Sequence, residues 1–187
     1  MGTVASSLLS QIPSLSNKGN LTVGILHDRQ HEELTELTAR LALRGPFHLI
    51  VGGEWLPDQD RLRRAVRRHT TAVAEVLEHP ILGRPSTCLQ LRDQLEKAND
   101  QQHPVFILNF FHHFYDPDID LTLRQRVLAD CCQRIQVLAS SRPVLALVRV
   151  MAVTEYQEFL PSLTSIAAEI IEIQEKPNTE AFQPSLL

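Results

Sequence analysis

The sequence predicts an α/β domain with a mainly parallel central sheet and helices on both of its faces. Apolar runs of strand length alternate along the chain with longer segments in which apolar residues recur at helical spacing. Two of the runs, PVFILNFF and PVLALVRV, are apolar at nearly every position, as strands buried on both faces are. Strands that alternate with helices in this way form a parallel sheet joined by right-handed crossovers.

The predicted strands are apolar runs bounded by Gly, Pro or polar residues. They cover residues 21–26, 47–53, 79–82, 104–111 and 143–150, with a last edge strand within 165–174. The piece at 79–82 is short and ends at Gly83, and the segment at 165–174 alternates apolar and polar residues near its end. Such alternation is typical of a strand with one exposed face.

The predicted helices fill the intervals between these strands. They cover residues 31–44, 58–78, 87–98 and 121–140. The first has Leu34, Leu37 and Leu41 at helical spacing and ends at the Gly-Pro pair that follows it. The segment 58–78 is predicted as one uninterrupted helix, and no element is assigned between residues 150 and 165.

The length and composition suit one domain, expected to cover residues 20–175. A flexible arm rich in Ser, Pro, Asn and Gly is expected at residues 1–19, and a tail at residues 176–187. The net charge of −4 creates no overall positive field, so binding to nucleic acid would need a local basic patch. Apolar stretches fall short of the roughly 18 residues that span a bilayer, so no membrane partner is expected.

The three cysteines, Cys88, Cys131 and Cys132, lack the spacing of metal ligands. Reduced structural thiols are the simplest interpretation, and they are typical of a cytoplasmic protein, or of a nuclear one in a eukaryote.

The turn between the first strand and the first helix is a place where many α/β proteins bind phosphates. Here it reads HDRQHEEL, without glycine or lysine. A phosphate loop needs glycines so that backbone N–H groups can surround the phosphates, and a lysine that reaches the terminal ones. We expect Asp28 to cap this helix, with Glu32 or Glu33 in its first turn, so that the turn satisfies the helix rather than a ligand.

Three stretches resemble the ATPase core of the RecA/RadA-like recombinases and their paralogs, from about residue 20 to 175. They are IVGGEWLPDQDRLRRAVRRH, QHPVFILNFFHHFYD and LRQRVLADCCQRIQVLASSRPVLALVRV. The resemblance places Glu54 at the family's catalytic glutamate. It makes the later stretches a Walker B strand, a DNA-facing loop, a long helix and the next core strand.

Three departures from the family pattern modify what the resemblance implies. The HDRQHEEL turn replaces the phosphate loop, Asn109 stands where the family has its magnesium-binding aspartate, and Arg149 lies near a polar sensor position. The resemblance therefore implies a RecA-like P-loop NTPase fold without a functional P-loop, with no cofactor and no ATP hydrolysis. It also implies a pseudo-ATPase that assembles as a homo-oligomer or with a RecA-like paralog, in DNA recombination or repair.

The densest basic run of the sequence lies on the predicted helix 58–78. One hypothesis is that its arginines contact the phosphates of DNA. The residues proposed for this contact are Arg61, Arg64, Arg67 and Arg68. The alternative, which the sequence favours slightly, is a solvated helix face balanced by Asp58 and Asp60.

Aromatic residues that follow two strand ends predict a protein interface. They are Trp55, Phe111, Phe114 and Tyr115. Trp55 either anchors a partner or caps the end of the sheet. Some of the other aromatic residues must lie in the core, while one or two are expected to be exposed to a partner subunit.

The alternative function is an enzyme or a small-molecule sensor with its site at the carboxyl ends of the strands, where open α/β sheets place such sites. The crevice residues would be Glu54, Asn109, His112 and His113. Adjacent histidines on an extended segment point apart, so no metal site is predicted there.

Overall fold

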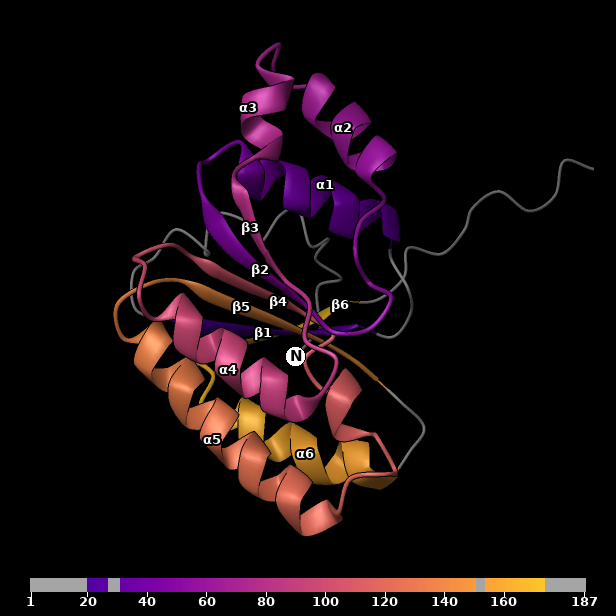
Figure 1. Ribbon diagram of the computed structural model, residues 1–187, viewed down its shortest axis with the longest axis vertical. Helices are drawn as coiled ribbons and strands as arrows, with labels where there is room; N and C mark the ends of the chain where they lie inside the picture. The colour runs from indigo at the N-terminus through magenta and orange to yellow at the C-terminus, as the bar shows by residue number, and fades with distance from the viewer. Residues whose placement is uncertain (1–19, 27–30, 151–153, 174–187) are drawn as a thin grey trace, which may run out of the picture.

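The computed structural model describes residues 20–26, 31–150 and 154–173, which form a six-stranded parallel sheet between two layers of helices (Figure 1). The strands are β1 (Leu21–Leu26), β2 (Phe47–Val51), β3 (Pro80–Gly83), β4 (Val105–Leu108), β5 (Val144–Arg149) and β6 (Glu169–Ile173). Their order in the sheet is β3-β2-β4-β5-β1-β6, so β3 and β6 are the edge strands. The prediction of an α/β domain with a parallel sheet is confirmed.

Helices cover both faces of this sheet. One layer contains α1 (His31–Ala42), α2 (Gln59–Arg67) and α3 (Val73–Leu77), and the other α4 (Cys88–Ala98), α5 (Leu121–Ala139) and α6 (Thr154–Thr164) (Figure 1). Side chains of the central strands alternate between the layers. In β2, Leu49 and Val51 pack in the cluster of α1–α3, whereas Ile50 packs in the cluster of α4–α6. This alternation explains why the central strands are apolar at nearly every position, with His48 of β2 and Thr22 of β1 among the exceptions.

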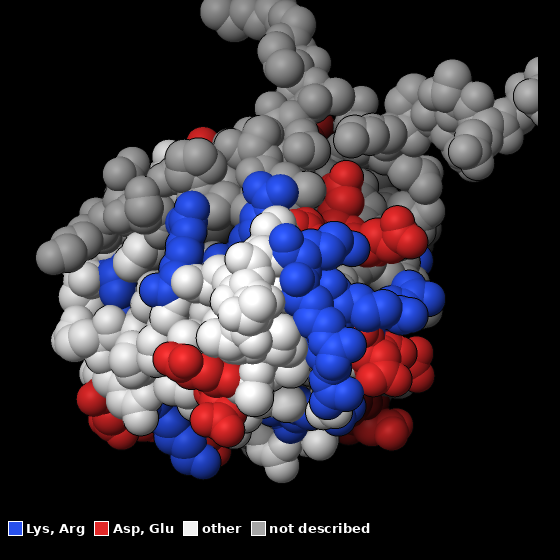
Figure 2. Space-filling view, turned by 90° about the horizontal axis from the view of Figure 1, so that it is seen from above, with Lys and Arg blue, Asp and Glu red and all other residues white. Residues whose placement is uncertain are grey.

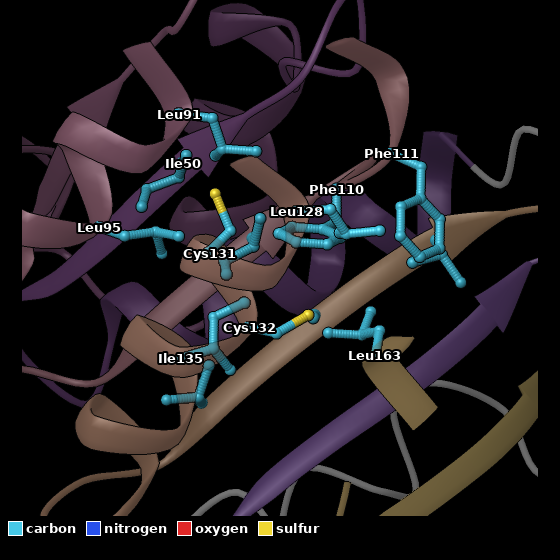
Figure 3. Close-up of a cluster of buried hydrophobic side chains, with 14 of the residues drawn as sticks. Ile50, Leu91, Leu95, Phe110, Phe111, Leu128, Cys131, Cys132, Ile135 and Leu163 are labelled. Carbon is cyan, nitrogen blue, oxygen red and sulfur yellow. The ribbon is translucent and has the colours of Figure 1, made fainter. Parts of the chain in front are cut away.

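The α4–α6 layer contains the three cysteines. Cys131 and Cys132 are adjacent on α5, yet both are buried, and Figure 3 shows both thiols inside the apolar cluster. Burial raises the pKa of the Cys132 thiol to about 11 and raises that of Cys131 as well. The thiols therefore remain protonated at neutral pH and act as small apolar side chains.

The long helix predicted over residues 58–78 is wrong, because the chain forms two helices separated by residues 68–72. α2 begins after Asp58, whose carboxylate accepts hydrogen bonds from the amides of Asp60 and Arg61. After the end of α2, the Thr70 hydroxyl accepts a hydrogen bond from the amide of Ala72. This local bond offers the backbone an alternative to the helical pattern and accompanies the break.

The strand predicted over 104–111 is also too long, because β4 ends at Leu108. Asn109 has a φ of 55°, in the left-handed region that asparagine tolerates better than most residues. The chain then turns into a short 3₁₀ helix, η3 (His112–Phe114). The helix α6 was not predicted, since Pro161 lies inside it and disguises the helical pattern.

Asp28 and the turn around it, the arm at residues 1–19 and the tail at residues 176–187 lie outside the described residues, so those expectations stay predictions. Within the described ranges, no helix is both long enough and apolar enough to cross a membrane.

Candidate functional site

The residues of the predicted crevice lie around the carboxyl ends of the neighbouring strands β2 and β4. The backbone amide of Gly52 donates to the carbonyl of Leu108 at 2.8 Å, and the Asn109 side-chain amide donates to the Gly52 carbonyl at 3.4 Å. A Cβ atom at Gly53 would lie 2.8 Å from the ring of His112. The backbone and the His112 ring are therefore in close contact where a crevice was predicted.

The two histidines do not point apart, because η3 is a tight helical turn and not an extended segment. Their ring centroids are 4.8 Å apart and nearly perpendicular. His112 is exposed, whereas His113 is 8% exposed. Burial, aided by the neighbouring His112, lowers the pKa of His113 to about 4, although a hydrogen bond to the Pro85 backbone opposes this shift. His113 is therefore a neutral, buried side chain at physiological pH.

The four crevice residues do not surround a common cavity among those found in the described part of the chain. Glu54 is exposed and His113 is buried. Cavities of about 430, 410 and 300 Å³ are lined by other residues. The described residues also contain no group of three or more His, Cys, Asp or Glu side chains that could hold a metal ion. The geometry gives the enzyme hypothesis no support.

The aromatic residues predicted to face a partner are mostly core residues, so the expectation of exposure was wrong. Trp55 is 3% exposed, Phe111 1% and Phe114 0%. Trp55 packs in the α1–α3 cluster, as its alternative role of a cap predicts. Phe111 and Phe114 contact Phe159 of α6 with ring centroids 6.3 and 6.2 Å apart. These rings hold α6 against η3.

Tyr115 is the one half-buried member of the predicted aromatic interface. Its ring stacks on Phe159 at a centroid distance of 6.0 Å. Tyr115 therefore also contributes to the packing of α6.

The basic residues of the predicted DNA contact are all on the surface. Arg61, Arg64 and Arg67 lie on α2, and Arg68 is its C-cap residue. Figure 2, which looks onto the α2–α3 end of the molecule, shows Lys and Arg side chains gathered in a band, with uncharged surface on one side and Asp and Glu side chains on the other. The structure thus places the basic run where a large ligand could reach it.

Arg68 is not free for this role, because it binds Glu36 of α1. Its guanidinium donates to the Glu36 carboxylate at 2.5 Å, and His69 and Arg40 contact the same carboxylate at 3.0 and 3.1 Å. Burial alone would raise the pKa of Glu36, but the hydrogen bonds from Arg68, His69 and Arg40 lower it to about 2. The Glu36 cluster therefore ties the end of α2 to α1.

A groove beside the edge strand β3 was not predicted from the sequence. Its cavity of about 300 Å³ is lined mainly by apolar side chains of β2, β3, α2, α3 and the turn after β2. They are Leu49, Leu56, Pro57, Leu62, Leu77, Pro80 and Leu82, together with Gln59 and Arg63. Leu82 is 49% exposed and Ile81 is 37% exposed. The only signal in the sequence was an uncharged strand, PILG, and its edge position could not be known without the strand order.

The chain matches no protein-family model, and no curated protein is significantly similar to it.

Proposed function

We propose that this protein is a non-catalytic interaction module on a degenerate RecA-like core, and that β3 is the edge through which two copies pair. The observation that carries the proposal is the uncharged edge strand β3, whose exposed apolar side chains, Ile81 and Leu82, adjoin the apolar groove. The resemblance in sequence suggests that such a pseudo-ATPase serves DNA recombination or repair.

The two edges of the sheet differ in their protection against pairing. Charged residues on an edge strand discourage the addition of another strand. β6 carries Glu169 and Glu172, both exposed, whereas β3 carries no charged residue. β3 is thus the edge without charge, although it is four residues long and begins with Pro80, which has no N–H to donate.

Pairing of β3 with β3 of a second copy satisfies both the backbone and the side chains. Edge strands present unpaired N–H and C=O groups that a further strand can use. An antiparallel pair related by a twofold axis gives each copy the same contact, as in most homodimers. Leu82 and Ile81 would then be covered, and burying half of a leucine side chain contributes about 1 kcal/mol.

Two features support a core that has lost nucleotide chemistry. The elements from β2 to β5 follow the order that the resemblance implies, with a Glu-containing turn before α2 and the 19-residue helix α5 before β5. The Asn109 amide is neutral and donates to the Gly52 carbonyl, which leaves it poorly suited to hold magnesium.

The pairing is tested by sedimentation equilibrium over a range of protein concentrations. We expect a monomer–dimer equilibrium for the natural chain and a monomer for Leu82→Asp. The matched control is Val137→Asp, a residue of α5 that is 53% exposed, and it should dimerise normally. A natural chain that stays monomeric, or a Leu82→Asp variant that still dimerises, would contradict the proposal.

The loss of nucleotide chemistry is tested separately with a fluorescent ATP analogue in the presence of magnesium. We expect no saturable binding and no phosphate release. Tight binding would overturn the pseudo-ATPase proposal while leaving the dimer interface untouched.

A further inference from the structure

We infer that the outward side of α2 is a binding site for the phosphate backbone of a nucleic acid, formed by Arg61, Arg64 and Arg67. The site recognises charge and not base sequence. It goes beyond the proposed interaction role and depends neither on β3 nor on pairing of two copies. Arg68, included in the hypothesis from sequence, is left out because Glu36 holds it.

The charge of the three arginines is not compensated by ion pairs within the described residues. Five arginines on and just after α2 are exposed: Arg61, Arg63, Arg64, Arg67 and Arg68. Two of them have carboxylate partners, since Arg63 lies 3.8 Å from Asp60 and Arg68 binds Glu36. No ion pair of the other three with any described residue is found at 4 Å or less. Backbone hydrogen bonds from Arg61 and Asp60 lower the pKa of Asp58, and the charges of Arg61 and Arg64 add to this shift. Asp58 therefore balances part of the charge of α2 without a close ion pair, and Arg67 is the farthest of the three arginines from it along the helix.

The packing of α2 fixes the side of the helix on which these arginines lie. Ala65 and Val66 are buried on its inner side. The Asp58 side chain caps the first turn, and the Glu36 cluster ties down the last one. A ligand on the outer side therefore meets a rigid helix, and binding orders only the arginine side chains.

The dimensions of the site suit a polyanion. Arg61 and Arg67 are separated by about 9 Å along the helix axis, at 1.5 Å per residue. Duplex DNA presents about five phosphate charges over such a length of its own axis. The arginine guanidinium can also donate two parallel hydrogen bonds to a phosphate.

Other partners fit this surface less well. A helix that binds a membrane inserts its apolar side, but the apolar side of α2 is buried against the protein. A protein interface is usually anchored by apolar or aromatic side chains at its centre. On the outer side of α2, Arg64 and Arg67 are accompanied by Asp60, and no exposed apolar residue lies on this helix.

The site predicts a defined salt dependence. Three phosphate contacts give a slope of about −2.7 for the logarithm of affinity against the logarithm of salt concentration. Affinity should then fall about 40-fold between 50 and 200 mM salt, with little difference between base sequences.

Fluorescence anisotropy with labelled single-stranded DNA, duplex DNA and RNA of mixed sequence tests the inference. We expect binding by the natural chain with the salt dependence given above, and loss of binding in Arg64→Glu/Arg67→Glu. The control Lys97→Glu/Arg126→Glu changes the net charge equally at two exposed positions away from α2 and β3 and should bind normally. Thermal unfolding of each variant, followed by circular dichroism, shows that both are folded.

Two competitors separate nucleic acid from other anionic partners: polyglutamate and vesicles containing phosphatidylserine. The inference is overturned if no nucleic acid binds at 50 mM salt up to about 100 µM protein, the weak end of non-specific binding. It is also overturned if the α2 variant binds as the natural chain does, or if only polyglutamate or vesicles bind. The sedimentation experiment on β3 is unaffected by any of these results, so the two proposals can fail separately.

Discussion

Glu36 is the residue on which the attachment of α2 to α1 depends. Its carboxylate contacts Arg40, Arg68 and His69, and it has a pKa of about 2 against an ordinary value of 4.5. A carboxyl whose pKa is lowered on folding stabilises the protein above its unfolded pKa. That contribution is lost as the pH falls from about 4.5 towards 2.

We expect Glu36→Gln to lower the free energy of unfolding at neutral pH by about 1–2 kcal/mol, because it leaves the guanidinium groups of Arg40 and Arg68 and the ring of His69 without their carboxylate partner. Urea unfolding over a pH series measures this change. Glu96→Gln is the control, since Glu96 pairs with Arg134 at 3.4 Å on an exposed surface and should matter little. Equal unfolding midpoints for the natural chain and Glu36→Gln would show that the cluster contributes nothing.

The lowered pKa of His113 predicts a second effect of pH on stability, at higher pH than the effect of Glu36. Its pKa is about 4 in the folded chain against 6.5 for a free histidine, so its contribution to stability is present above pH 6.5 and is lost as the pH falls towards 4. We expect the imidazole NMR signals of His113 to stay constant from pH 8 to about 5.5. His113→Gln should remove the part of the pH dependence between 6.5 and 4 and leave the part due to Glu36. Titration of His113 near pH 6.5 would contradict its burial as a neutral group.

At the scale of the elements, the end of β4 depends on the conformation of Asn109. Glycine adopts a positive φ without strain, whereas a residue with a Cβ and no local hydrogen bond does not. We expect Asn109→Gly to be nearly neutral and Asn109→Ala to cost about 1 kcal/mol of stability, measured by urea unfolding. Equal losses for both variants would show that the bond to Gly52, which both remove, matters more than the backbone, and a larger loss for glycine would contradict the prediction.

Asn109 also illustrates which parts of the fold could be predicted from the sequence and which could not. The central strands were found because their apolar runs need no knowledge of neighbours. The ends of the elements were missed where a local conformation decides them, as at Asn109 and at Thr70. The helix α6 was missed because Pro161 usually ends a helix. Here a tertiary contact outweighs this local signal, since the Phe159 ring packs against η3 and stabilises the helix.

In the candidate sites, too, features set by the local sequence could be predicted, whereas features set by contacts between distant segments could not. The exposure of Arg61, Arg64 and Arg67 could be predicted, because a dense basic run is rarely buried. The choice between the two roles of Trp55 and the ion pair between Arg68 and Glu36 could not, since both depend on contacts between α1 and the segment after β2. The groove beside β3 depends on the strand order of the whole sheet and was missed for that reason.

At the scale of the whole molecule, the two edges of the sheet should respond differently to protein concentration. If two copies pair through β3, amide hydrogen exchange at Leu82, whose N–H faces away from β2, should slow as the concentration rises through the dimer dissociation constant. Exchange at Ile170 and Ile171 of β6 should not change. Hydrogen exchange followed by mass spectrometry measures both edges in one experiment. Protection confined to β6 would show that the copies pair through β6 and would contradict the proposal.

The position of β3 at the edge also determines where the arginines of a dimer would lie. Antiparallel pairing across this edge places the twofold axis perpendicular to the sheet, so both α2 helices would lie on the same face of one continuous sheet. A nucleic acid bound to one helix would then hold the second helix at a high effective concentration. Two weak contacts would act as a single bivalent one, and the apparent affinity would fall when the protein is diluted until its copies separate.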